Sequence, residues 1–166
     1  LKITDEWLEK VRLSSLKFAS WCSSSFVSED GLIMTNHHCI DFVEDRIQKE
    51  NEDIAKNGFY APTLQDERKV SGVYVDQLVY MKDITEELRD KEKNNDSAKS
   101  KADLLAEIKK NYDKETELNC VVVPFYSGAK YSIYGYKRYN DVRAVYFNES
   151  STGLYGGDPD NFTYPR

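Results

Sequence analysis

Hydrophobic residues near the start of the chain recur at helical spacing and then change to a strand-like pattern. Thr4 is a residue type that favours the first position of a helix. Trp7, Leu8 and Val11 follow at the spacing of a single helical face. This pattern predicts a helix that begins near Thr4 and ends within residues 12–15, ahead of an extended segment.

A β-hairpin is predicted next. Residues 25–28 and 32–35 are typical of strands, and the segment 29–31 between them contains Asp-Gly, a strong turn signal between two apolar runs. The following stretch, residues 40–56, has apolar side chains at helical spacing. It predicts an amphipathic helix, either continuous or broken around Asn51.

The rest of the chain is rich in strand patterns apart from one charged stretch. Residues 84–117 are highly charged and weakly apolar, and they predict a polar helical insertion. Strands are predicted on both sides of it, at residues 70–81, 118–125, 131–139 and 142–147. We therefore predict a mainly β fold of the α+β class, part of a β-barrel with helical insertions, in a single domain spanning residues 1–166.

Composition and charge narrow the possible classes of function. The 166-residue chain has a net charge of -6 and a pI near 5.0, so it lacks the basic face that binding to nucleic acid requires. No apolar stretch approaches the roughly 18 residues needed to span a bilayer. We therefore expect neither a nucleic-acid partner nor a membrane span.

Cysteine and histidine residues cluster around the predicted hairpin. The two histidines of the chain, His37 and His38, are adjacent at the predicted end of its second strand. If the hairpin register holds, Cys39 lies near Cys22, and a disulfide closing this loop of about 16 residues would stabilise the fold by about 3 kcal/mol. A histidine mounted there suits general-base catalysis, because a serine hydroxyl needs an imidazole held in one orientation and tautomer.

Two other interpretations apply to this cluster. A histidine in an arbitrary domain is most often a surface residue or a satisfied core residue. Zinc binding is the second interpretation, but adjacent residues of a strand point to opposite faces, so His37 and His38 cannot easily share one metal. No CxxC or HxxxH spacing supports a metal site either. We expect no metal and no cofactor.

Residues 22–39, with the sequence CSSSFVSEDGLIMTNHHC, resemble the catalytic-histidine segment of trypsin-like peptidases. In that segment a cysteine, two strands and Thr-Ala-Ala-His-Cys follow in order. The Thr-Asn-His-His-Cys form after Gly-Leu-Ile is similar to that of the bacterial dipeptidyl-peptidase 7/11 family, the S46 serine exopeptidases. Alignment on Cys39 makes His38 the catalytic histidine. Four further segments match that family in order, at residues 57–61, 123–128, 139–145 and 156–166.

The resemblance implies a periplasmic or secreted serine exopeptidase that removes dipeptides from the free amino terminus of oligopeptides. It places this chain in the N-terminal portion of a trypsin-like domain, with the remainder of the parent chain and a homodimer of the parent enzyme as implied partners. It also implies that Asn161 and Phe162 bind the amino terminus of the peptide. An amide oxygen accepts a hydrogen bond from an ammonium group and an aromatic face attracts a cation, although Phe162 replaces the family's usual tryptophan.

Only one member of the catalytic triad falls within this chain. In the family the aspartate follows the Pro-Arg motif, just past Arg166, and the serine comes several hundred residues later. The resemblance therefore implies that residues 1–166 are inactive in isolation. Asp141 precedes an apolar strand and is a tempting acid, but we interpret it as a structural carboxylate paired with Arg138 or Arg143.

Two alternatives from other classes remain open. The first is a noncatalytic secreted binding domain with a peptidase-like barrel. The second is a cysteine hydrolase that uses Cys39 with His37 or His38, which a disulfide at Cys39 would rule out. Cys120 lies in an apolar strand, and we expect it to be a buried free thiol or to pair with a cysteine beyond this chain.

Overall fold

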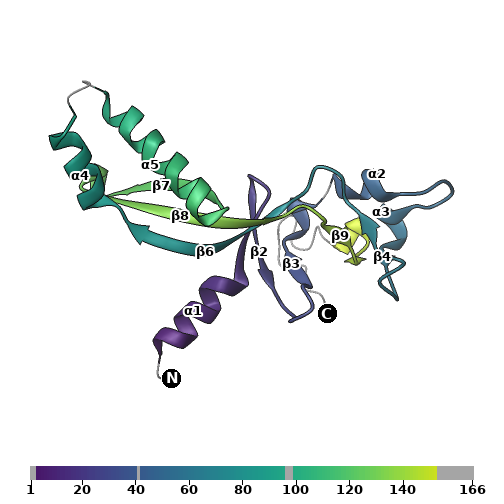
Figure 1. The fold of residues 1–166 in the computed structure, drawn as a ribbon. Coiled ribbons are helices and arrows are strands. Elements are labelled where there is room, and N and C mark those ends of the chain that lie inside the picture. The colour runs from purple at the N-terminus through teal and green to yellow at the C-terminus, as the bar shows by residue number, and fades with distance from the viewer. Residues whose placement is uncertain (1–2, 41, 96–98, 153–166) are drawn as a thin grey trace. The chain divides into compact units, whose positions relative to one another are not determined.

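The chain folds into strands and helices of an α+β fold that is mostly β, in agreement with the predicted class (Figure 1). The computed structural model describes residues 3–40, 42–95 and 99–152. These residues form two compact units, each with its own hydrophobic core. That residues 1–166 form one folding domain stays a prediction.

The first unit, which we call the helical unit, lies within residues 1–13 and 76–138. Its main elements are α1 (Asp5–Ser14), β6 (Val75–Asp83), α4 (Thr85–Lys93), α5 (Lys101–Thr116), β7 (Asn119–Phe125), a 3-10 turn η2 (Tyr126–Gly128) and β8 (Lys130–Tyr139). The strands are neighbours in the order β6, β8, β7. Figure 1 shows α4 and α5 along one side of them, where the sequence predicts a polar helical insertion.

Helix α5 is polar overall, yet it supplies the centre of the core of this unit. Leu104, Ile108 and Tyr112 are buried at the i, i+4 spacing of one helical face. They pack with Cys120 of β7 and Ile133 of β8, both fully buried. The few apolar residues of the charged stretch therefore lie on one stripe, which is enough to attach the helix to the strands.

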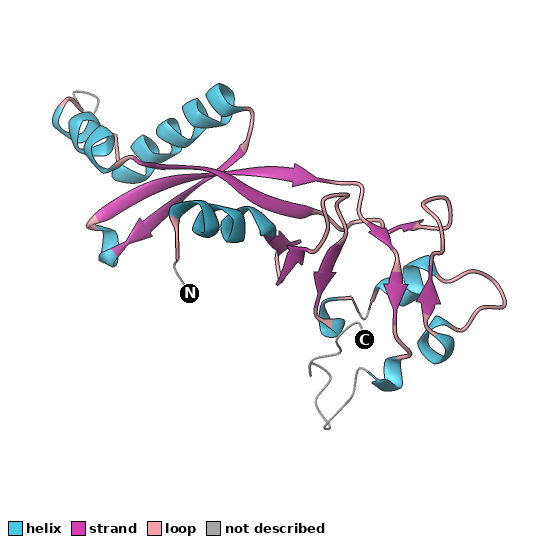
Figure 2. Cartoon of the chain, turned by 90° about the horizontal axis from the view of Figure 1, so that it is seen from below, coloured by secondary structure: helices cyan, strands magenta, loops and turns pink. Residues whose placement is uncertain are grey.

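The second unit, which we call the disulfide unit, lies within residues 14–75 and 139–166. Its elements are β1 (Ser15–Phe18), β2 (Cys22–Phe26), β3 (Ile33–Thr35), η1 (His37–Cys39), α2 (Val43–Ile47), α3 (Ile54–Asn57), β4 (Phe59–Tyr60), β5 (Arg68–Lys69), β9 (Arg143–Ala144) and β10 (Tyr146–Phe147). Figure 2 shows how short most of these helices and strands are.

Strands β1, β2 and β3 form an antiparallel meander, and the predicted hairpin is its second half. Phe26 pairs with Ile33, so the connecting turn is longer than the predicted Glu-Asp-Gly turn. The backbone N–H of Val27 donates to the carbonyl of Leu32 at 2.9 Å, which closes this turn. Gly31 within it has a φ of +87°, a conformation that favours glycine.

The predicted helix over residues 40–56 is broken, which is one of the two forms that the pattern allowed. Helix α2 ends at Ile47, Asn51 adopts a positive φ of 67°, and α3 begins at Ile54. Asp53 caps α3 by accepting a hydrogen bond from the N–H of Lys56. The break lets two short helices cover the core instead of one long helix running past it.

The core of the disulfide unit combines residues from both of its sequence segments. Phe18 of β1, Val43 of α2 and Val75 at the start of β6 pack with Ala144 and Phe147 from the later segment. Beyond the β1–β2–β3 meander, β4 pairs with β10 and β5 pairs with β9. The strands of the described part of this unit do not form a closed barrel.

Candidate active site

A disulfide joins the first strand of the hairpin to the turn that follows its second strand. Cys22 opens β2 and Cys39 ends η1, and their Cα atoms are 6.0 Å apart, within the usual range for a disulfide. Pairing of Ser24 with Thr35 brings the start of β2 beside the end of β3, as the predicted register requires. The predicted bridge is present, and it anchors the segment that carries both histidines.

His37 and His38 follow the end of strand β3, as predicted, but they lie in a turn of 3-10 helix and not in extended backbone. Strand β3 ends at Thr35, and the N–H of Cys39 donates to the carbonyl of Asn36 at 3.1 Å. A 3-10 helix has about three residues per turn, so successive side chains point about 120° apart. Side-chain alternation across a sheet therefore does not apply to this segment.

The imidazole of His38 lies against the disulfide. Its Nε2 atom is 3.4 Å from the Sγ atoms of both Cys22 and Cys39. His38 is exposed, whereas Cys39 beside it is buried. This placement suits proton exchange with a hydroxyl brought beside the ring.

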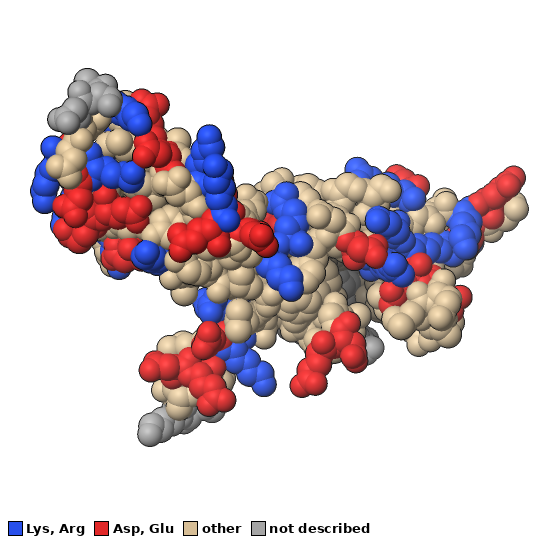
Figure 3. Space-filling view, in the orientation of Figure 1, with Lys and Arg blue, Asp and Glu red and all other residues tan. Residues whose placement is uncertain are grey.

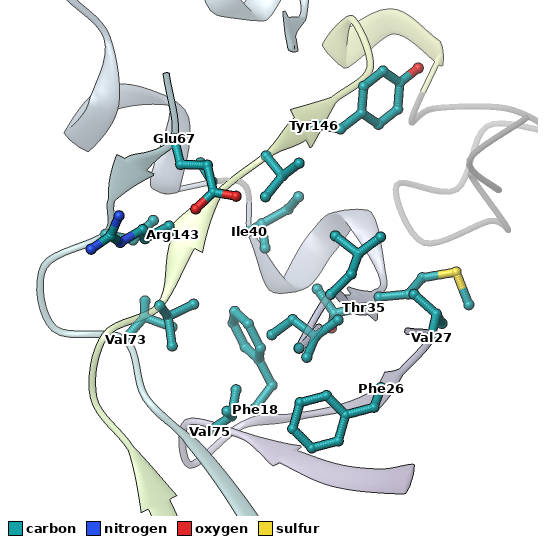
Figure 4. A pocket seen from close by; sticks show the side chains of 18 of the residues that line it. Phe18, Phe26, Val27, Thr35, Ile40, Glu67, Val73, Val75, Arg143 and Tyr146 are labelled. Carbon is teal, nitrogen blue, oxygen red and sulfur yellow. The ribbon is translucent and has the colours of Figure 1, made fainter. Parts of the chain in front are cut away.

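His37 points elsewhere and lines a cavity of about 1200 Å³ in the disulfide unit. Figure 4 shows that the wall is mainly apolar, with Phe18, Val73, Val75 and Ile40 among the side chains that line it. No pattern in the sequence indicates this cavity. Its wall combines segments that are far apart in the chain, among them strand β1, the hairpin turn, the histidine turn and the segment around Arg143.

Asp141 is paired with Arg143, one of the two partners predicted for it. The Arg143 guanidinium donates to it through Nη2 at 2.8 Å, and Lys69 Nζ lies 3.6 Å away. The hydrogen bond from Arg143 holds the pKa of Asp141 below its ordinary value. Of the two partners proposed for Asp141, Arg143 is the one observed, because Arg138 forms a bidentate pair with Asp76.

Glu44 is a buried carboxylate that no motif in the sequence indicates. Only 8% of its surface is exposed, and both of its carboxylate oxygens lie near Ser150 Oγ, at 3.1 and 3.0 Å. Charged residues on a short amphipathic helix normally point to solvent, so the sequence pattern offered no sign of this burial. The pair joins α2 to the segment that precedes residue 153.

The remaining candidate residues fall into two groups. Asn161 and Phe162, the predicted contacts for a peptide amino terminus, lie outside the described residues. Cys120 is a buried free thiol, as expected, and burial raises its pKa, which disfavours the reactive thiolate. With Cys39 in a disulfide and Cys120 protonated, neither cysteine is suited to act as a nucleophile, which argues against the cysteine hydrolase.

Charges on the described surface are mixed in sign. Figure 3 shows basic and acidic side chains interspersed over α4 and α5. Glu107 there accepts from Lys91 and Lys99 at 2.8 and 2.7 Å, which lowers its pKa to about 2. None of the described helices is both long and apolar enough to cross a bilayer.

The whole chain matches one protein family. The sequence model of the family described as Peptidase S46 covers residues 1–166. Dipeptidyl-peptidase 7 of Porphyromonas gingivalis is 30% identical over 153 residues, or 90% of this chain and 22% of that protein. The Asp/Glu-specific dipeptidyl-peptidase of Capnocytophaga gingivalis is 32% identical over 176 residues, or 100% of this chain and 25% of that protein. The chain spans about a quarter of the length of the curated relatives it matches.

Solved structures share the fold. The crystal structure of Porphyromonas endodontalis DPP11 in complex with the dipeptide Arg-Glu matches with a TM-score of 0.73 and 25% identity, over 94% of this chain and 24% of that one. The structure of that protein in complex with substrate matches with a TM-score of 0.75 and 26% identity, over the same shares of both chains. The similarity therefore extends from sequence to three-dimensional structure.

Proposed function

This chain belongs to peptidase family S46, and from that membership we propose that it is the N-terminal part of a serine exopeptidase that releases dipeptides from the free amino terminus of oligopeptides. His38 is the general base. The observation that carries the proposal is the imidazole of His38, held 3.4 Å from both sulfurs of the Cys22–Cys39 disulfide. The names of the relatives and the dipeptide in a solved relative support the substrate class.

The proposed chemistry is acyl transfer to a serine. His38 takes the proton from the serine hydroxyl as its oxygen attacks the carbonyl carbon, and then gives that proton to the leaving amine. The disulfide and the 3-10 turn limit the positions of the ring, which lowers the entropy lost in reaching the reactive geometry. In this proposal the serine and its aspartate lie beyond Arg166 in a trypsin-like domain, so residues 1–166 alone are inactive.

The parts of the proposal outside the described residues follow the same family resemblance. Asn161 and Phe162 bind the ammonium group of the substrate, the amide as an acceptor and the ring through its face. The enzyme works in the periplasm or after secretion, where a disulfide such as Cys22–Cys39 persists.

Substitution of His38 in the full-length protein tests the proposed base. We expect His38→Ala to lower kcat/KM for dipeptidyl chromogenic substrates by at least about 10³-fold, the usual effect of removing a triad member. His37→Ala is the matched control, because this neighbour lines the apolar cavity, and we expect it to keep activity within about tenfold. Near wild-type activity in folded His38→Ala protein would contradict the proposal.

A second measurement separates the exopeptidase from a noncatalytic binding domain. The full-length wild-type protein should cleave substrates with a free amino terminus and leave their N-acetylated forms intact, since the ammonium group is part of recognition. A pure, folded full-length protein with no cleavage of either substrate favours the binding domain.

A further inference from the structure

The two cysteines that contact His38 form, together with that histidine, a group suited to a metal ion. Among the described residues, Cys22, His38 and Cys39 are the one set of at least three histidine, cysteine or acidic side chains whose ligand atoms converge, all within 4.8 Å of one another. The objection that adjacent residues point to opposite faces does not hold for His38 and Cys39, because both lie in the 3-10 turn η1.

The distances in this group approach those of a tetrahedral zinc site. With Zn–S bonds of about 2.3 Å and Zn–N bonds of about 2.0–2.1 Å, a tetrahedral site places sulfur and nitrogen ligands about 3.5 Å apart. The Nε2 atom of His38 is 3.4 Å from Sγ of Cys22 and 3.4 Å from Sγ of Cys39. Two of the three ligand-to-ligand distances are therefore already close to those of a metal site.

The third distance is the one between the sulfurs, which the disulfide holds together. We infer that reduction of the Cys22–Cys39 bridge converts Cys22, His38 and Cys39 into a binding site for a thiophilic divalent cation such as Zn²⁺. The ligands are the two Sγ atoms and Nε2 of His38, and water takes the fourth position. Side-chain rotation separates the sulfurs to the about 3.8 Å that a tetrahedral site requires.

With a dithiol as the reductant, electrons and protons balance both in the reduction of the disulfide and in the binding of Zn²⁺. The dithiol gives two electrons and two protons to the bridge, so that Cys22 and Cys39 become thiols while the reductant becomes a cyclic disulfide. Binding of Zn²⁺ then displaces the two thiol protons and uses the lone pair of Nε2 on a neutral His38. No other group changes its oxidation state.

The burial of the three residues allows a cation to enter from solvent. His38 is exposed and Cys22 is half-buried, whereas Cys39 lies behind them with 2% of its surface exposed. The approach is therefore from the side of His38, and the backbone turn holds Cys39 as the inner ligand. This arrangement differs from a lone surface histidine, which offers a single ligand.

A metal on Nε2 occupies the lone pair that a general base uses. Under the proposed function, on which this consequence rests, the reduced enzyme with Zn²⁺ bound is inactive, while the oxidised enzyme has no such site. Metal binding itself does not depend on the proposed function. An experiment can therefore contradict the metal site or the role of His38 as base without contradicting the other.

Titration with Co²⁺ tests the site in the full-length protein. The protein is reduced with dithiothreitol, desalted without oxygen, and titrated with Co²⁺, which reports thiolate ligands through an intense near-ultraviolet band. We expect this band at about one equivalent, its loss when Zn²⁺ is added, and no such band in the oxidised protein. His38→Ala should weaken binding at least tenfold, and His37→Ala, which changes the neighbouring imidazole, should bind as the wild type does.

Three outcomes would overturn the site: no band in folded reduced protein, equal Co²⁺ binding by His38→Ala and wild type, or loss of the near-ultraviolet circular dichroism of the fold on reduction. Peptidase assays on the same samples separate the two proposals. Inhibition by Zn²⁺ of the reduced enzyme alone supports both. A Co²⁺ site whose occupation by Zn²⁺ leaves activity unchanged supports the site and contradicts the role of His38 as base.

Discussion

Arg68 connects three segments of the disulfide unit through one side chain. Its guanidinium donates to both carboxylate oxygens of Glu52, at 2.5 and 2.7 Å, and to the carbonyl of Ile47 at 3.0 Å. It also lies 4.5 Å from the ring centre of Phe59. One side chain of β5 therefore holds the end of α2, the loop before α3 and strand β4 together.

The Glu52–Arg68 pair predicts a pH-dependent contribution to stability. The hydrogen bond from Arg68 lowers the pKa of Glu52 from 4.5 to about 2. A carboxyl group whose pKa is lowered in the folded state stabilises the fold at pH values above its ordinary pKa. This contribution is lost as the pH falls from about 4.5 to about 2. We expect Glu52→Gln to be less stable than wild type at pH 7, with the difference shrinking over that interval. Urea midpoints measured from pH 7 to pH 2 check this.

The matched control for that series is Glu50→Gln, which removes an exposed carboxylate two residues away. Its urea midpoint should follow that of the wild type at every pH. A difference between Glu52→Gln and wild type that stays constant from pH 7 to pH 2 would show that the pair does not titrate as described.

Gly58, in the Asn-Gly-Phe-Tyr-Ala segment, is predicted to be intolerant of any side chain. Its φ is +68°, and a Cβ there would lie 2.7 Å from the carbonyl oxygen of Phe147, a backbone atom that has little room to move. We expect Gly58→Ala to lower the free energy of unfolding by about 2–4 kcal/mol, from backbone strain plus the clash. Gly31→Ala is the control: φ is +87° but nothing lies within 4 Å, so only strain of about 1 kcal/mol applies. Equal losses in thermal denaturation would refute the role of the clash.

At the scale of elements, the stability of helix α5 depends on hydrogen bonds in its first turn. Ser100 Oγ accepts from the N–H of Asp103 at 3.2 Å, and the Asp103 carboxylate accepts from the N–H of Ser100 at 3.1 Å, forming a capping box. We expect Ser100→Ala to lower the free energy of unfolding by about 1 kcal/mol, because it leaves a helix N–H without its acceptor. Ser100→Asn keeps an acceptor and should retain most of that stability in urea denaturation. Equal losses for both variants would contradict the capping role.

Elements with a repeating pattern could be predicted from the sequence, and those fixed by packing could not. The hairpin, the Cys22–Cys39 bridge and the helical character of the charged insertion follow from alternation, turn chemistry and charge. The 3-10 turn at His37 could not, because three residues carry no periodicity and the turn depends on where β3 ends. Glu44 was missed for a similar reason, since only its distant partner Ser150 makes its burial acceptable.

At the scale of the whole molecule, the two units differ in how complete their cores are. In the helical unit, Ile108 and Ile133 have no exposed surface. In the disulfide unit, core residues such as Phe18 and Val73 also line the cavity of about 1200 Å³. An apolar hollow of that size open to water is unfavourable, and the relatives have about four times the length of this chain. Under the proposed function, in which this chain is the N-terminal part of a longer enzyme, we expect other parts of that enzyme to fill or cover it.

That inference predicts different dye binding by the isolated chain and by the full-length protein. A protein consisting of residues 1–166 should enhance the fluorescence of 8-anilinonaphthalene-1-sulfonate several-fold per molecule relative to the full-length protein, because the dye reports accessible apolar surface. The signal should saturate and should disappear when urea unfolds the disulfide unit, which distinguishes a formed cavity from general disorder. Equal fluorescence from the two proteins would mean that the cavity stays open in the parent, and its apolar wall would then face solvent or ligand in the complete enzyme.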